Sequence, residues 1–265
     1  FLSVVLIGTI YPIFLDVLSS QKISVGPPFY HKLIIPFLIP FLFIMAIGPK
    51  LKWIKSNLEN KIYLISLLII SILLSYLIVK NFEYNFLINT ILISGALYLF
   101  FMNLRDFFIE KFKNISQNIS HFGFSLLILS ILINNLFSTE IITNLKVGQS
   151  FEASKTEIVF ENINQKMEKN YKSIIANFRI KNSSGKIENF LPELRIYNQP
   201  NIITSEADIK TTLMSDKFIV INLVQNQDYF NVRYQIKPFM LWIWISVIII
   251  SFGGLMSLIK KKYEK

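Results

Sequence analysis

The sequence contains no cysteine and only two histidines, His31 and His121, among its 265 residues. Without cysteine, this chain can form no disulfide, no thiolate metal site and no cysteine nucleophile. The strong nitrogen ligands that it could offer a metal are therefore the two imidazoles. Any ligand chemistry within this chain must depend on one or both of them.

Other signatures of chemistry are also missing. The sequence has no phosphate-cradling glycine loop, no His-Glu-x-x-His site and no serine hydrolase elbow. Carboxylates are not evident inside the apolar runs, which argues against an ion-coupled transporter because such proteins carry these groups near the membrane midplane. The basic charge lies in the connections between apolar runs, so nucleic-acid binding is not indicated.

What the chain does contain is apolar sequence: 52% of its residues are hydrophobic. This composition predicts an integral membrane protein. The candidate spans are residues 1–10, 33–49, 61–79, 85–102, 119–137 and 239–259. A span needs about 20 apolar residues to cross the hydrocarbon layer, and the complete runs approach or reach that length. Since Phe1 already lies in an apolar run, we expect the first span to be truncated and an N-terminal portion to lie outside this chain.

Basic residues gather in every second connection between the spans. These residues are Lys50, Lys52, Lys55 and Lys61, then Arg105, Lys111 and Lys113, and finally Lys260, Lys261, Lys262 and Lys265. The positive-inside rule places such connections on the cytoplasmic or matrix side of the membrane. The long stretch 138–238 then lies on the opposite, outer side.

The stretch 138–238 is polar and has strand patterns. Apolar and polar residues alternate strictly in Phe230–Lys237, as in a half-buried strand. Further candidates are Lys217–Gln225, Ile174–Lys181 with a hairpin turn at Asn182–Gly185, Glu157–Ile163 and Phe190–Tyr197. The predicted fold is a membrane α-helical protein of about six spans with an inserted extracytoplasmic β-rich domain. Its parts are 1–137 with five spans, 138–238 as the β-rich domain, and 239–265 as the last span and a basic tail.

His121 opens the apolar run that continues to Phe137. An ionisable side chain at membrane depth is costly, so it usually faces protein or a cofactor. Phe124, Ser125 and Ile128 share its helical face, and Gly123 would let a flat macrocycle or another helix approach closely. His121 is therefore either an axial haem ligand or an interfacial histidine bonded to a neighbouring helix. Residue chemistry alone favours the second interpretation.

Three other features lie in or next to the predicted spans. His31 lies just before a span and is interpreted as a solvated interfacial residue. The Gly26-Pro27-Pro28 triplet is expected to be non-helical, because each proline restricts its own φ and biases its predecessor toward extended geometry. Gly253-Gly254 predicts close helix packing within the last span.

In order along the chain, several motifs resemble the C-terminal part of the CcmF family, the membrane haem lyase subunit of the system I cytochrome c maturation pathway. They are Gly8-Thr9-Ile10-Tyr11-Pro12, Lys22-Ile23-Ser24-Val25-Gly26-Pro27-Pro28-Phe29, Ser120-His121-Phe122-Gly123, Pro192-Glu193-x-Arg195-x-Tyr197 and Lys237-Pro238-Phe239-x-x-Trp242-Ile243-Trp244. The resemblance spans nearly the whole chain.

The resemblance implies that His121 is an axial ligand to the iron of a membrane haem b, with the second ligand outside this chain. It assigns no role to His31. Haem would arrive from the haem chaperone CcmE and be joined by thioether bonds to a Cys-x-x-Cys-His motif in apocytochrome c, alongside thiol-handling assembly factors. The haem b would pass electrons, from quinol, that reduce the incoming haem.

The resemblance also implies a location. The protein would be a multi-pass protein of the bacterial or mitochondrial inner membrane, with 138–238 in the periplasm or the intermembrane space. The alternative function is a non-catalytic membrane scaffold or assembly subunit. In that case the outer β-domain docks partners, and His121 is structural.

Overall fold

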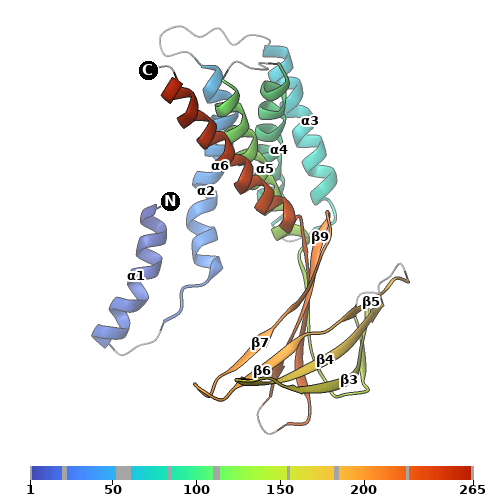
Figure 1. The fold of residues 1–265 in the computed structure, drawn as a ribbon. Coiled ribbons are helices and arrows are strands. Elements are labelled where there is room, and N and C mark those ends of the chain that lie inside the picture. The colour runs from blue at the N-terminus through green and yellow to red at the C-terminus, as the bar shows by residue number, and fades with distance from the viewer. Residues whose placement is uncertain are drawn as a thin grey trace. The chain divides into compact units, whose positions relative to one another are not determined.

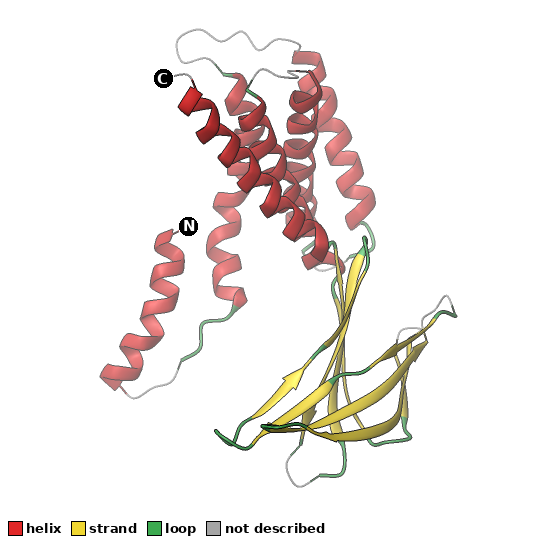
Figure 2. Ribbon diagram, viewed as in Figure 1, coloured by secondary structure: helices red, strands yellow, loops and turns green. Residues whose placement is uncertain are grey.

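The computed structural model describes residues 2–19, 23–51, 61–82, 85–109, 114–153, 156–181, 185–224 and 227–263. The chain divides into two compact units. The helical unit comprises Phe1–Leu132 and Ser246–Lys265, and the second unit comprises Ile133–Ile245. Figure 1 follows the chain through both, and Figure 2 shows that one is built of helices and the other mainly of strands.

Six helices in the described residues are long and apolar enough to cross a membrane. They are α1 (Leu2–Ser19), α2 (Pro27–Ile47), α3 (Lys61–Val79), α4 (Phe86–Ile109), α5 (Ile115–Phe137) and α6 (Met240–Tyr263), and a short 3₁₀ helix, η1 (Gly48–Lys50), follows α2. The predicted fold class, a helical membrane protein with an inserted β-rich domain, is confirmed.

Helix ends differ from the apolar runs in two places. Helix α1 continues past Ile10 to Ser19 and includes Asp16, and α4 continues past Met102 to Ile109 and includes Asp106. Hydropathy marks the part of a helix that suits hydrocarbon, whereas the helix itself can extend into the polar interface. The described helices therefore do contain carboxylates near their ends, although Asp106 is ion-paired.

The expectation that Gly26-Pro27-Pro28 is non-helical is wrong in part. Gly26 has extended geometry, with φ −96° and ψ 178°, but Pro27 and Pro28 are the first two residues of α2. A first-turn proline loses no hydrogen bond, because the first amides of a helix have no intrahelical acceptor, and its φ already suits a helix. The triplet thus starts a helix and does not form a separate loop.

The helical unit has its core where α2, α3 and α4 meet. Its buried apolar residues are Leu42, Ala46, Leu64, Leu92, Tyr98, Leu99 and Met102. Gly95 permits the close approach of α2, since a Cβ at this position would lie 3.3 Å from the Leu42 Cβ. Phe124 and Ile128 of α5 pack against the same core. This face of α5 is also the face that carries His121.

The second unit contains a domain of two antiparallel sheets. The strands are β1 (Thr139–Leu145), β2 (Ser150–Ala153), β3 (Thr156–Met167), β4 (Tyr171–Lys181), β5 (Ile187–Phe190), β6 (Glu193–Tyr197), β7 (Ile203–Glu206), β8 (Asp208–Thr211), β9 (Ser215–Leu223) and β10 (Phe230–Pro238). One sheet has the order β1-β10-β9-β8, and the other has the order β2-β3-β4-β6-β7, with β5 also paired to β4. The core lies between them, where Phe160 stacks on Phe178 at 4.4 Å.

All five predicted strand regions are strands, but the pattern missed β1, β2, β7 and β8. Three of these have only four residues, too few for alternation to stand out. In β10, Val232 and Tyr234 are buried, as the strict alternation predicts. The predicted strand 190–197 corresponds to β6 and overlaps β5 only at Phe190, so most of β5 was missed as well. Leu191-Pro192 separates the two strands, because proline cannot donate a hydrogen bond to a sheet.

The chain enters the domain through β1 and leaves it through β10, and these two strands are neighbours. The first strand, β1, pairs antiparallel with the last, β10, so that Thr139 lies opposite Ile236. The Asn134 side-chain amide, in the last turn of α5, donates to the Pro238 carbonyl at 2.6 Å. Because the two ends of the domain meet, it can be inserted between two consecutive spans.

Some predicted features lie outside the described residues. They are Lys22, the charged residues Lys52, Lys55, Lys111, Lys113 and Lys265, and residues 182–184 of the predicted hairpin turn.

Candidate functional site

His121 lies near the start of α5, which begins at Ile115, and its imidazole is half-buried. Among the described residues, no hydrogen bond or ion pair engages the ring. The interpretation of His121 as a histidine bonded to a neighbouring helix through its side chain therefore finds no partner in the part of the chain that the structure describes. A neutral imidazole has one acceptor nitrogen, and none of the described residues occupies it.

The main chain at His121 is held by α4. The side-chain amide of Asn103, which is buried, donates a hydrogen bond to the His121 carbonyl, with Nδ2 and O 3.2 Å apart. On the adjacent face, Phe122 packs against Phe100 and Phe107, with ring centroids 5.6 and 5.9 Å apart. Both contacts come from α4, which therefore holds α5 at the level of the imidazole. Asn103 escaped prediction, because it directly follows the apolar run 85–102 and its burial comes from the packing of the helices.

On another side, α5 packs closely on α6. A Cβ at Gly123 would lie 2.9 Å from side-chain carbons of Ile249 and Ile250. At Gly253 it would lie 2.8 Å from the Ser116 carbonyl oxygen and equally close to the Ser120 amide. Gly123 therefore admits a helix, one of the two occupants that the sequence allowed. Close packing is confirmed at Gly253, whereas a Cβ at Gly254 would meet nothing within 4 Å.

An ion cluster lies about one helical turn further along α4 from Asn103. Lys50 Nζ contacts the two carboxylate oxygens of Asp106 at 2.6 and 2.8 Å, and Arg105 Nη1 lies 3.3 Å from the same carboxylate. The Arg105 guanidinium also lies over the Tyr63 ring, 5.0 Å from its centroid. Lys50 and Arg105, which the charge pattern assigned to separate connections, thus meet in one cluster that joins η1, α3 and α4.

His121 fits the role of one axial ligand to a haem iron, and the described residues hold no second one nearby. They contain no group of three or more histidine, aspartate or glutamate side chains that could bind a metal ion. His31, in the first turns of α2, is exposed. The donor set thus supports a single imidazole ligand and not a complete site.

Two of the motifs that carry the resemblance meet where α1 packs on α2. A Cβ at Gly8 would lie 2.8 Å from the Tyr30 ring and 3.0 Å from the Phe29 ring. The Gly8 motif and the segment that ends at Phe29 are therefore linked by packing. This contact is structural and brings no reactive group together.

In the β-domain, the motif Glu193-x-Arg195-x-Tyr197 lies along β6 and forms a polar cluster. Arg195 Nη2 lies 3.0 Å from Glu193 Oε2, and the guanidinium stands 5.2 Å from the centroid of the Tyr171 ring. The Tyr171 and Tyr197 rings are 5.2 Å apart. The hydrogen bond from Arg195 is the main cause of a lowered pKa for Glu193. The cluster connects β4 and β6.

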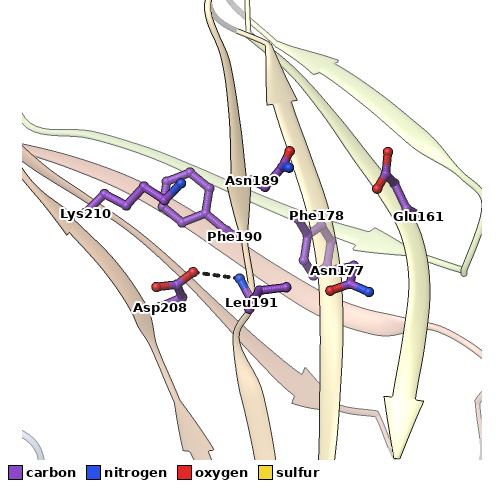
Figure 3. Close-up of a pocket in the computed structure, with 8 residues that line it drawn as sticks. All are labelled: Glu161, Asn177, Phe178, Asn189, Phe190, Leu191, Asp208 and Lys210. Carbon is purple, nitrogen blue, oxygen red and sulfur yellow. Dashed lines mark hydrogen bonds between the residues drawn. The ribbon is translucent and has the colours of Figure 1, made fainter.

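A pocket of about 380 Å³ lies on the same domain (Figure 3). Its lining residues are Glu161, Asn177, Phe178, Asn189, Phe190, Leu191, Asp208 and Lys210. Lys210 Nζ stands 4.6 Å over the Phe190 ring, and the Asp208 carboxylate accepts a hydrogen bond from the Leu191 amide at 2.7 Å. Both charged residues of β8 are thus engaged with the opposite sheet. The pocket carries no arrangement suited to catalysis.

Comparison with known proteins matches this architecture. The family model of the CcmF C-terminal beta-sandwich matches residues 136–238. Cytochrome c-type biogenesis protein CcmF of Pseudomonas fluorescens is 25% identical over 99% of this chain and 42% of that protein. CcmF of Escherichia coli K12 is also 25% identical, with the same two coverages. The chain thus spans under half the length of these relatives.

A solved structure, Cytochrome c Heme Lyase CcmF, superposes with a TM-score of 0.70 at 17% identity, over 95% of this chain and 42% of that one. At this identity the match supports the fold. The matched β-sandwich, the helical arrangement and the near-complete coverage by the relatives agree with one another. The chain is similar to CcmF proteins over nearly its whole length, and residues 136–238 match the model of their C-terminal beta-sandwich.

Proposed function

We propose that this chain is the C-terminal part of a cytochrome c haem lyase subunit in which His121 is an axial ligand of a membrane haem b. The enzyme would join haem to apocytochrome c through thioether bonds to a Cys-x-x-Cys-His motif. The substrate supplies both thiols, which agrees with the absence of cysteine from this chain. The second axial ligand would come from outside residues 1–265.

The half-buried imidazole of His121, to which none of the described residues donates or accepts a hydrogen bond, is the observation that carries the ligand assignment. An ionisable group in a membrane helix without a protein partner is expected to serve a function. Since His31 is exposed, His121 is the stronger candidate of the two histidines. The haem chemistry in this proposal is inferred from the similarity to CcmF proteins. The residue of this chain that would bind the iron is His121.

The other residues would act by positioning. Asn103 holds the main chain of His121 through its carbonyl, and Gly123 lets α6 support the opposite side of α5. Such support fixes a ligand more firmly than a single helix could. A bound haem b would supply one-electron redox chemistry, which would serve to reduce the incoming haem with electrons from quinol.

The β-domain would lie on the periplasmic or intermembrane-space side of an inner membrane. The basic residues of the alternate connections support that orientation. The partners on that side would be the haem chaperone CcmE, apocytochrome c and its thiol-handling assembly factors.

The test is the absorption spectrum of the purified full-length protein. We expect His121→Ala to abolish or alter a b-type spectrum while the protein stays inserted and folded. His31→Ala is the matched control, because it removes the other histidine of this chain from an exposed position. That variant should retain the spectrum.

An unchanged spectrum in a folded His121→Ala protein would exclude His121 as a ligand. If the protein carries no b-type haem at all but still binds apocytochrome c, the scaffold function would be favoured over the lyase.

A further inference from the structure

The turn between β8 and β9 exposes two large apolar side chains side by side. Leu213 and Met214 are each 66% exposed. The turn closes through the Thr212 amide, which donates to the Ser215 carbonyl at 3.0 Å. A loop tip in water normally carries polar or small residues. The exposure of Leu213 and Met214 must therefore be explained by what surrounds the turn.

The surroundings are the start of the last span. The Trp242 indole donates to the Leu213 carbonyl at 2.8 Å, and the Phe239 amide donates to the Met214 carbonyl at 2.9 Å. Phe239 has a positive φ of 58° and directly precedes α6, whose apolar window begins at Met240. The two bonds therefore hold the tip at the level of the first turn of α6.

Several polar groups of the turn are paired inside the protein. Thr212 Oγ1 donates to the Ser215 carbonyl at 2.7 Å and accepts from the Ser215 amide at 3.1 Å. Together with the bonds from Trp242 and Phe239, these contacts engage the Leu213, Met214 and Ser215 carbonyls and the Thr212 and Ser215 amides. Backbone that enters a lipid environment must be paired in this way, because no water there can replace a missing partner.

Aromatic residues mark the same level. Trp244, two residues beyond Trp242, is 60% exposed. Tryptophan gathers where the hydrocarbon meets the headgroups, since its ring is apolar and its N–H is polar. Because the Trp242 N–H donates a hydrogen bond to the tip, the tip lies at the same membrane boundary as these two tryptophans.

We propose that the turn of Thr212–Ser215 inserts Leu213 and Met214 into the outer boundary of the lipid bilayer. The β-domain would then contact the membrane at a third point besides its two chain connections. The occupant of this surface is lipid, because the tip is continuous with the lipid boundary of α6 and the Leu213 and Met214 carbonyls are paired within the protein.

The test uses a fluorescent label whose emission reports polarity. Because this chain has no cysteine, Leu213→Cys in the full-length protein, with any cysteine outside residues 1–265 removed, gives a single site. The protein is reconstituted in phosphatidylcholine vesicles, labelled with an environment-sensitive NBD dye, and quenched with iodide from the water or with nitroxide-bearing lipid from the bilayer.

Leu223→Cys is the matched control. Leu223 is 41% exposed and lies at the other end of β9, roughly 26 Å from Ser215 at the rise of a strand. Ile248→Cys, in α6 and 67% exposed, is the reference for a lipid-facing site. Met214→Cys provides a second tip site if Leu213→Cys fails to fold.

The tip label should emit at shorter wavelength than the Leu223 label, with several-fold stronger quenching by nitroxide lipid and several-fold weaker quenching by iodide. Iodide quenching equal to that at Leu223 would overturn the proposal, since the tip would then lie in water. Protection from both quenchers would also overturn it, because protein and not lipid would cover the tip.

Discussion

The side-chain amide of Asn103 donates a hydrogen bond to the main-chain carbonyl of His121, with a Nδ2–O distance of 3.2 Å. The bond joins α4 to α5 at the residue that is the proposed haem ligand. It engages the carbonyl and leaves the imidazole untouched. Asn103 is therefore a positioning residue in the proposed site.

Replacing Asn103 tests this role. Asn103→Leu keeps a similar volume but removes the donor, and we expect a loss of about 1 kcal/mol in stability, as for one buried hydrogen bond. If α5 then shifts, the haem spectrum should broaden and the reduction potential should change. Thermal unfolding and a redox titration followed by absorption measure the two effects. Asn103→Gln keeps a donor and should recover part of the signal, whereas a purely structural role would leave the potential unmoved in all three proteins.

The packing of α5 on α6 predicts a different sensitivity at two glycines. Gly123→Ala should destabilise the protein by about 1–3 kcal/mol, because a Cβ would lie 3.0 Å from the main-chain nitrogen of Ile250 and backbone cannot move aside as a side chain can. Gly254→Ala is the control, since a Cβ there meets nothing within 4 Å. Its stability should be unchanged or slightly higher, because alanine favours a helix over glycine. Thermal unfolding in one detergent compares the two, and equal losses would argue against the described helix contact.

An ion pair in the β-domain predicts a loss of stability in acid. Burial alone would raise the pKa of the Glu188 carboxyl, but hydrogen bonds and charge from Lys217 and Lys186 outweigh it, and the pKa lies below its ordinary value of 4.5. Lys217 Nζ lies 2.9 Å from both carboxylate oxygens. A lowered folded-state pKa stabilises the fold above the unfolded-state pKa, and this stability is lost as the pH falls through the folded-state value.

Hydrogen exchange of β5 and β9 peptides measures this loss. Protection should fall as the pH drops below about 4.5, after correction for the intrinsic exchange rate. Glu188→Gln should be less stable at neutral pH and should show a weaker dependence in the same range. An identical acid profile in the variant would mean that other carboxylates govern the transition.

Tyr234 offers a substitution that should not destabilise the domain. The residue is 1% exposed, and its hydroxyl has no hydrogen-bond partner in the described residues. Burial, with a smaller effect of the nearby Glu188 charge, raises its pKa to about 12. Since burying an unpaired hydroxyl costs about 1–3 kcal/mol, Tyr234→Phe should leave the free energy of unfolding unchanged or raise it. Phe190→Ala, in the same core, should lower it by about 3–5 kcal/mol. A comparable loss in Tyr234→Phe would reveal a hydrogen bond that the hydroxyl makes in the native protein.

Much of the fold was predictable because the membrane imposes a simple rule. A helix that crosses hydrocarbon must be apolar along its length, so the spans appear directly in the sequence. The strict alternation of Phe230–Lys237 likewise predicts one buried face, which the structure confirms at Val232 and Tyr234. The four-residue strands β2, β7 and β8 escaped prediction, because they are held by the ladder to neighbouring strands and not by a pattern of their own.

The sequence by itself determined that this chain is a helical membrane protein with a β-rich insertion, and that His31 and His121 are its only imidazoles. Tertiary structure alone decided which of them is half-buried, that Asn103 holds the main chain of His121, and that Gly123 admits a helix. The same holds for Trp242 and Leu213, 29 residues apart in sequence. The reason is physical: periodicity shows which face of a helix or strand is buried, whereas the contact partner depends on the packing of elements that are distant in sequence.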